Sequence, residues 1–151
     1  HRSLVAKKGP VPEGDYRIPF GKARIARSGD DVTVVAVGSM VDRSLEAADE
    51  LAESGVSIEV IDPRTLAPLD TDTIVESTGR TGRLAIVDET FAPCGVGAEI
   101  ATQVGERGCS LKAPAIRISG LHTPTPYSPT LETAVVPQVE QIVDGLRGLM
   151  R

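Results

Sequence analysis

The sequence predicts a three-layer α/β/α sandwich built on a mostly parallel sheet of about five strands, one of them antiparallel. Short apolar runs alternate along the chain with amphipathic stretches of helical period, which is the pattern of strands connected by helices. The run V-T-V-V-A-V at 32–37 is almost continuously apolar and β-branched, as expected of a strand covered on both faces. Strands joined through helices pair in parallel with right-handed crossovers, so helices should cover both faces of the sheet.

The first two strands are expected at 22–27 and 31–37. Ser28, Gly29 and Asp30 lie between them and favour a tight turn, so we expect a β-hairpin. This hairpin would supply the one antiparallel strand of the predicted sheet.

A helix is expected directly after the second strand, beyond a turn at Gly38 and Ser39. Its apolar residues repeat at helical spacing, with charged residues on the opposite face. The apolar stripe comprises Val41, Leu45, Ala48 and Leu51 with Ala52. Gly55 follows at the place where a helix ends in a left-handed cap.

The rest of the chain repeats the alternation of strand and helix. A strand at 57–61 leads into a proline-rich loop at 62–70 and a short helix at 71–78, which the glycine-containing stretch 79–82 ends. The later elements are a strand at 83–88, a helix at 96–105, a strand at 115–119 and a closing amphipathic helix. The closing helix has Pro137 in its first turn and an apolar stripe of Val139, Ile142, Val143, Leu146 and Leu149 with Met150.

The first twenty residues differ from the remainder, because they are rich in proline, glycine and charge and have no apolar period. We therefore expect 1–20 to be a linker or an arm that crosses a neighbouring surface, and 21–151 to be the domain. The chain starts without an initiator Met, which suggests that it begins partway through a longer protein.

Composition excludes several classes of function. The net charge is −5 and no basic stripe is present, so nucleic acid is not an expected partner. No apolar run approaches the roughly 20 residues that span a bilayer, so the chain should not enter a membrane. Two cysteines without a signal peptide fit a reducing cytoplasm, and the two histidines show no zinc-ligand spacing.

Four loops should gather at the carboxyl ends of the strands, where open α/β sheets bind ligands. They are 38–40, 62–70, 88–97 and 120–129. Gly95, Val96 and Gly97 begin a helix whose backbone N–H groups could hold an anion, although tight packing is the expected explanation of the glycines. Cys94 precedes this helix and could be reactive, but it has no nearby base and we expect an inert thiol.

Three polar residues in these loops have two interpretations each. His122 lies in the proline-stiffened loop 120–129, where it could transfer protons or could fix the loop by a hydrogen bond. Asp62 and Arg64 could contact a substrate, or could form an internal pair that braces their loop. The structural interpretation is the expected one in each case.

Several stretches occur in an order that indicates a family. They are I-P-F-G-K-A-R-I-A-R-S-G-D-D-V-T-V-V-A-V-G-S-M-V, I-D-P-R-T-L-A-P-L-D, T-G-R-L-A-I-V-D-E, L-K-A-P-A-I-R-I and H-T-P-T-P-Y-S-P. With these stretches in order, the chain resembles the carboxyl-terminal, transketolase-like domain of a β subunit. The family is that of the thiamine-diphosphate-dependent 2-oxo acid dehydrogenases, which include pyruvate, branched-chain and acetoin types. P-C-G at 93–95 and H-T-P at 122–124 favour the acetoin type.

The resemblance implies a heterotetramer of α and β subunits that holds thiamine diphosphate and Mg²⁺ outside this chain and passes an acyl group to a lipoyl acyltransferase. It implies that this chain alone is inactive, binds no cofactor, and serves subunit assembly and acyltransferase docking, with His122 near the active-site approach. The candidate contacts with these partners are Asp62, Arg64, Lys112 and Tyr127. Lys112 stands where pyruvate-type relatives often carry an acidic residue, which puts the usual docking mode in doubt.

Two alternatives remain open. The chain could belong to a transketolase or a deoxyxylulose-phosphate synthase, which share this type of domain. It could also be a free-standing module that binds a small anion at Gly95 and Gly97. The D-P-R-T-L-A-P-L-D and H-T-P-T-P-Y-S-P stretches together favour the 2-oxo acid group, and the substrate pocket is expected outside the chain.

Overall fold

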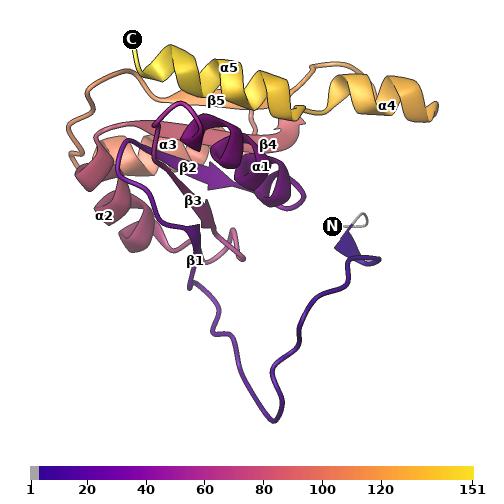
Figure 1. Ribbon diagram of the computed structural model, residues 1–151, viewed down its shortest axis with the longest axis horizontal. Helices are drawn as coiled ribbons and strands as arrows, with labels where there is room; N and C mark the ends of the chain where they lie inside the picture. The colour runs from indigo at the N-terminus through magenta and orange to yellow at the C-terminus, as the bar shows by residue number, and fades with distance from the viewer. Residues whose placement is uncertain (1–3) are drawn as a thin grey trace.

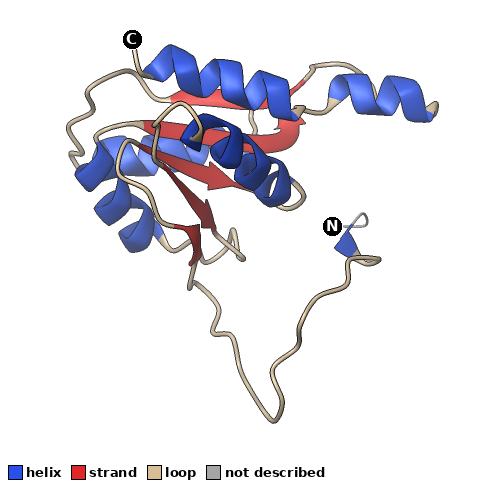
Figure 2. Cartoon of the chain, in the orientation of Figure 1, coloured by secondary structure: helices blue, strands red, loops and turns tan. Residues whose placement is uncertain are grey.

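The computed structural model describes residues 4–151, which fold as a five-stranded sheet in the order β1-β3-β2-β4-β5 with helices on both faces (Figures 1 and 2). The predicted three-layer fold is confirmed. The strands are β1 (Arg24–Arg27), β2 (Val32–Ala36), β3 (Ile58–Asp62), β4 (Leu84–Phe91) and β5 (Ile116–Gly120). The helices are α1 (Met40–Ala52), α2 (Thr71–Thr81), α3 (Val96–Glu106), α4 (Pro129–Val135) and α5 (Val139–Leu149).

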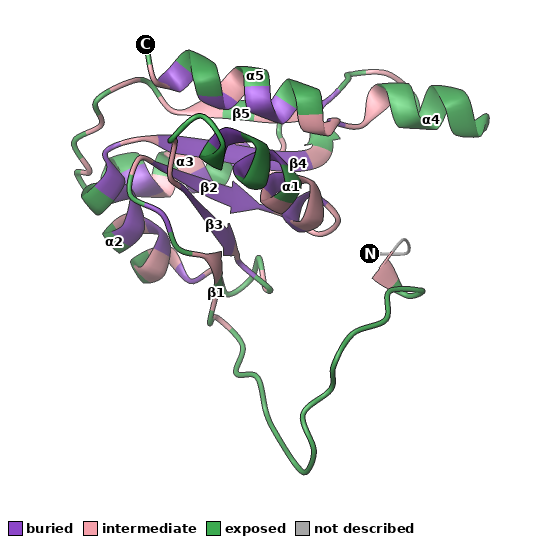
Figure 3. Cartoon of the chain, viewed as in Figure 1, coloured by how far each residue is buried: buried purple, intermediate pink, exposed green. Residues whose placement is uncertain are grey.

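The central strand β2 is completely buried, as its apolar composition predicts (Figure 3). It pairs in parallel with β3 on one side and with β4 on the other, so that Val34 lies beside both Val60 and Ala85. Val34 packs toward the layer of α1 and α5, whereas Val35 packs toward the layer of α2 and α3. Burial on both faces explains why this strand lacks the alternation of a half-exposed one.

The two helical layers follow the stripes read from the sequence. In α1, Val41, Ala48 and Leu51 are buried, although Leu45 is half-buried and Ala52 is exposed. In α5, Leu146 and its neighbours on the stripe pack into the same core as α1. Gly55 has a φ of 80°, which confirms the left-handed turn expected after α1.

The predicted β-hairpin is wrong, because β1 pairs antiparallel with β3 and not with β2. The segment between β1 and β2 crosses the beginning of β3, and a Cβ on Gly29 would lie only 2.2 Å from the carbonyl carbon of Ile58. Strand β3 instead inserts between β1 and β2, where both of its faces are buried and its Glu59 pairs with Arg80. β1 takes the edge of the sheet, and its Arg24 remains exposed there.

Three element boundaries also differ from the prediction. Helix α2 continues through Gly79 and ends at Gly82, which has a φ of 74°. The exposed Gly79 is tolerated because Thr81, two residues further, is buried and its hydroxyl lies 2.9 Å from that of Thr33. Strand β4 extends to Phe91, and Pro137 precedes the N-cap of α5 instead of lying in its first turn.

Helix α4 was not predicted, since its residues were assigned to a loop and to the stretch before the closing helix. Pro129 occupies its first turn, and none of its residues is buried. Figure 1 shows this helix projecting beyond the sheet in line with α5. The helix has only 7 residues, which is too short a stretch for helical spacing to identify it in the sequence.

The chain reaches β1 through an exposed segment that loops away from the sheet (Figure 1). Its end is fixed to the loop after β3, because Gly21 N donates to Thr65 Oγ1 at 3.0 Å and Ala23 N to Asp70 Oδ2 at 2.9 Å. Asp70 also caps α2 through Thr73 N. Burial alone would raise the pKa of Asp70, but these hydrogen bonds outweigh it and lower the pKa. The division into an arm at 1–20 and a domain at 21–151 stays a prediction, and its first three residues lie outside the described part.

Within residues 4–151, every helix is too short or too polar to cross a bilayer.

The crossing at Gly29 generates the first testable prediction. Gly29→Ala should lower the free energy of unfolding by about 2–3 kcal/mol, because its methyl group would collide with backbone atoms of β3. Gly79→Ala is the matched control: nothing lies within 4 Å of its Cβ position, and the change should stabilise α2 by up to about 1 kcal/mol. Urea denaturation measures both. Equal stabilities for the two variants would contradict the crossing.

Candidate active-site edge

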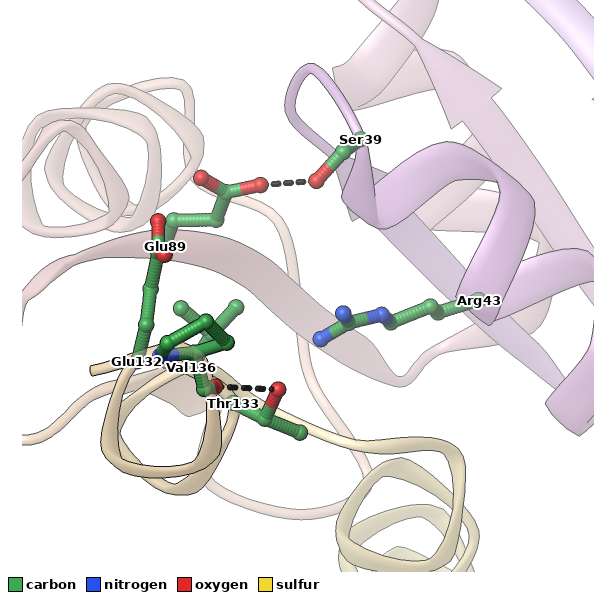
Figure 4. Close-up of a pocket in the computed structure, with 7 residues that line it drawn as sticks. Ser39, Arg43, Glu89, Glu132, Thr133 and Val136 are labelled. Atoms are coloured by element: carbon green, nitrogen blue, oxygen red, sulfur yellow. Dashed lines mark hydrogen bonds between the residues drawn. The ribbon is translucent and has the colours of Figure 1, made fainter. Parts of the chain in front are cut away.

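The polar cavity of greatest interest lies where the connections of the sheet diverge. From β2 the chain moves to β3 on one side, and from β4 it moves to β5 on the other, so the crevice at the carboxyl ends of β2 and β4 is the topological switch point. A cavity of about 230 Å³ occupies this position (Figure 4). Its lining residues are Ser39, Arg43, Glu89, Pro129, Glu132, Thr133 and Val136.

Three elements bring these side chains together. Ser39 is the N-cap of α1 and donates its hydroxyl to Glu89, near the end of β4. The residues on either side of Glu89 are joined by a hydrogen bond of 2.6 Å from Thr90 N to Asp88 Oδ1. Arg43 lies one turn into α1 and donates to the Pro137 carbonyl, and the opposite wall comes from α4. Figure 4 shows the Arg43 guanidinium reaching toward the space between Glu89 and α4.

Burial raises the pKa of the Glu89 carboxyl above its ordinary value. The positive charge of Arg43 opposes this shift, while the nearby carboxyls of Asp88 and Glu132 reinforce it. Glu89 therefore holds its proton more readily than an exposed glutamate does. A carboxyl of this kind can change between donor and acceptor at the edge where ligands bind.

The glycines of the predicted anion site lie in close contact with other parts of the chain. A Cβ on Gly95 would be 2.4 Å from the Phe91 carbonyl oxygen, and one on Gly97 would be 3.2 Å from Asp88 Oδ2. The buried Asp88 thus already presents a carboxylate beside the start of α3. Tight packing explains both glycines, and anion binding at Gly95, Val96 and Gly97 stays a prediction.

His122 lies at the predicted edge but outside the switch-point cavity. Its exposed ring is tilted against Phe91, with 5.1 Å between the ring centroids. The loop itself is fixed by the backbone, since Leu121 N donates to Val135 O at 2.9 Å. A role for His122 in proton transfer remains untested.

Asp62 braces its loop as expected, although with a different partner. Its carboxylate accepts a 3.0 Å hydrogen bond from Arg64 N and pairs with Arg24 at 3.3 Å. The Arg64 side chain makes no ion pair with any residue between 4 and 151. Both residues line a second cavity, of about 520 Å³, at the ends of β2 and β3.

The candidate partner contacts do not form a single surface. Tyr127 is fully exposed after the end of β5, on the same edge as Asp62 and Arg64. Lys112 precedes β5 and therefore lies at the opposite edge, where its Nζ donates to Thr81 O at 2.9 Å. Lys112 closes the carboxyl end of α2, which is a structural role. Its contact with a partner stays a prediction.

Arg43 and Glu89 were not selected from the sequence. Arg43 reads as one of several charges on the outer face of α1, and Glu89 as a polar residue at the end of a strand. Only the strand order makes them neighbours at the switch point.

Among residues 4–151, no three histidine, cysteine or acidic side chains are grouped so as to hold a metal ion.

These features define a three-layer α/β domain with its candidate functional loops at the carboxyl edge of a mixed sheet. The model of the transketolase C-terminal domain matches residues 21–142. The chain therefore belongs to the transketolase C-terminal domain family, as its resemblance implies.

Its relatives include β subunits of two kinds of enzyme. The chain is 46% identical to the acetoin:2,6-dichlorophenolindophenol oxidoreductase subunit beta of Cupriavidus necator, over 100% of this chain and 45% of that protein. The subunit of the same name from Bacillus subtilis is 49% identical over 90% of this chain and 40% of its own length. The pyruvate dehydrogenase E1 component subunit beta of Staphylococcus epidermidis is 42% identical over 93% of this chain and 43% of its own. The chain thus spans less than half the length of these relatives.

Solved structures support the fold. A split-gene transketolase, described as an inactive β4 tetramer, superimposes with a TM-score of 0.80 at 24% identity, over 94% of this chain and 46% of that one. A 2-oxoglutarate:ferredoxin oxidoreductase from Magnetococcus marinus gives a TM-score of 0.58 at 13% identity, over 86% of this chain and 19% of that one. At these identities the likeness concerns the fold alone.

The raised pKa of Glu89 leads to a prediction for stability. Because the folded chain holds this proton more tightly than the unfolded chain, ionisation of Glu89 costs stability as the pH rises through its pKa, and the cost vanishes at lower pH. Glu89→Gln should therefore raise the Tm at neutral pH, and the gain should shrink as the pH is lowered. Glu46→Gln, at an exposed position of α1, is the control. The measurement is the Tm of each variant from neutral to acidic pH. If the Tm gain of Glu89→Gln grew as the pH was lowered, the raised pKa of Glu89 would be contradicted.

Proposed function

We propose that the chain is the carboxyl-terminal domain of the β subunit of a thiamine-diphosphate-dependent dehydrogenase that acts on acetoin or a 2-oxo acid. The observation that carries this proposal is the 46% identity to an acetoin oxidoreductase β subunit over the whole chain. The acetoin type is favoured over the pyruvate type by a small margin, because the acetoin relatives above are 46% and 49% identical, whereas two further pyruvate dehydrogenase β subunits reach 44% and 45%. Its free thiols, Cys94 and Cys109, suit the reducing cytoplasm proposed for it.

Thiamine diphosphate and Mg²⁺ are proposed to bind outside this chain, in the remainder of the enzyme. The residues present do not fit the metal, since those between 4 and 151 contain no group of three potential ligands. The domain would act as a structural partner for the catalytic parts. Its proposed partners are an α subunit, a second β subunit and a lipoyl acyltransferase.

The surface that suits such partners is the carboxyl edge of the sheet. Several large apolar side chains are exposed there, on the loops after β3, β4 and β5 and on α4. They are Leu66, Phe91, Leu121, Tyr127 and Leu131. Exposed apolar side chains gathered on one side of a domain are typical of a protein interface. The projecting helix α4, which buries none of its residues, would complete its packing against a second subunit.

The location of the cofactor site is tested by calorimetry. The isolated chain should give no saturable heat with thiamine diphosphate and Mg²⁺, and adding an α subunit alone should not restore decarboxylation. Fusing the chain behind the amino-terminal part of the Cupriavidus necator β subunit, in place of its own carboxyl-terminal domain, should give an active enzyme with the matching α subunit. Micromolar, Mg²⁺-dependent binding by the isolated chain would refute the proposed location, and an inactive hybrid that still assembles would count against the proposed family role.

The interface is tested by self-association. We expect the isolated chain to associate weakly through the loops at 62–70 and 120–129, beside the closing helix, because this edge would lack its usual partners. Tyr127→Asp and Leu131→Asp should shift sedimentation toward the monomer across a hundredfold concentration range. Ala52→Asp, at an exposed position at the end of α1 that lies away from this edge, is the control. A constant monomer mass for the unsubstituted chain at all concentrations would contradict the predicted self-association.

A further inference from the structure

The switch-point cavity contains a cation whose hydrogen-bonding capacity is only partly used. The half-buried Arg43 donates from Nη1 to the Pro137 carbonyl. Within residues 4–151, no carboxylate lies at salt-bridge distance from its guanidinium. A guanidinium carries five N–H donors in a planar fork that matches a carboxylate in two parallel hydrogen bonds. Several donors of Arg43 therefore remain for a bound group.

Hydroxyl and carboxyl groups stand around this cation on the other walls. The Ser39 hydroxyl donates to Glu89, and the Thr133 hydroxyl donates to the Pro129 carbonyl at 3.0 Å. Both hydroxyl oxygens retain lone pairs, so they can accept a further hydrogen bond. Figure 4 shows Arg43, Glu89 and Thr133 approaching the cavity from three different elements.

Size and charge restrict what the cavity can bind. Its volume of about 230 Å³ corresponds to about eight water molecules. Glu89 and Glu132 line it together with Arg43, so a dianion such as phosphate meets more repulsion than a monoanion does. The raised pKa of Glu89 reduces this repulsion for a single carboxylate.

We propose that this cavity binds a small hydroxycarboxylate, with its carboxylate on the Arg43 fork and its hydroxyl among Ser39, Glu89 and Thr133. The position supports the proposal, because ligands of open α/β sheets bind in the crevice at the switch point. The site uses residues of this chain alone. It would exist whether or not the chain serves in the enzyme assembly proposed above.

Lactate is the probe for the test, with acetate and inorganic phosphate as comparisons. In amide-resolved NMR titrations of the 151-residue chain, lactate should shift the signals of Ser39, Glu89 and Thr133 with a Kd on the order of 1 mM. Acetate, which lacks the hydroxyl, should bind several-fold more weakly, and phosphate more weakly still. Equal binding of acetate and lactate, or tighter binding of phosphate, would overturn the hydroxycarboxylate assignment.

Two substitutions separate recognition from folding. Arg43→Lys keeps the charge but loses the planar fork, so it should weaken lactate binding about tenfold. Arg64→Lys, at the same edge but outside this cavity, is the matched control and should leave lactate binding unchanged. Thr133→Val, at an exposed position that cannot unfold the core, should weaken lactate without affecting acetate. The site would be refuted if Arg43→Lys left lactate binding unchanged. It would also be refuted if lactate shifted the amide signals of residues outside this cavity only.

Discussion

The burial of β2 on all sides is the constraint on which the rest of the molecule depends. A strand with no exposed side chain needs a partner strand on each edge and a helical layer on each face. The parallel neighbours β3 and β4 meet the first requirement, and the layers of α1 with α5 and of α2 with α3 meet the second. Even its one polar residue, Thr33, has a buried partner in Thr81. The switch-point cavity follows from this arrangement, since it lies at the carboxyl ends of β2 and β4, where the chain leaves these strands toward opposite sides of the sheet.

Much of the fold could be predicted from the sequence, because the spacing of apolar residues indicates which side chains are buried. The period of α1 and α5 and the unbroken apolar run of β2 each identify an element and its environment. The partner of β1 could not be predicted, since pairing order depends on which strand gains most by a central position. Gly29 was interpreted as a turn residue, whereas its close approach to Ile58 marks a crossing. Sequence alone does not distinguish these two uses of a glycine.

The sequence predicted the edge of the sheet on which the candidate site lies, but not the residues that form it. The rule that ligands meet the carboxyl ends of strands predicted the edge at which this cavity lies. It could not select Arg43 or Glu89, because their proximity requires the strand order and the position of Pro137 after α4. Helix α4 contributes Thr133 to the cavity and Leu131 to the apolar rim, so one exposed element belongs to both surfaces of this edge.

The antiparallel direction of β1 determines where the arm joins the domain. Arg24, at the start of β1, lies beside Asp62 at the end of β3, so the arm arrives at the edge that carries the functional loops. Gly21 and Ala23, which join the arm to β1, are hydrogen-bonded to Thr65 and Asp70 of the 62–70 loop. In mechanical terms the arm is a tether attached to that loop. A displacement transmitted along it would reach the loop at the carboxyl edge through these hydrogen bonds and the sheet through β1.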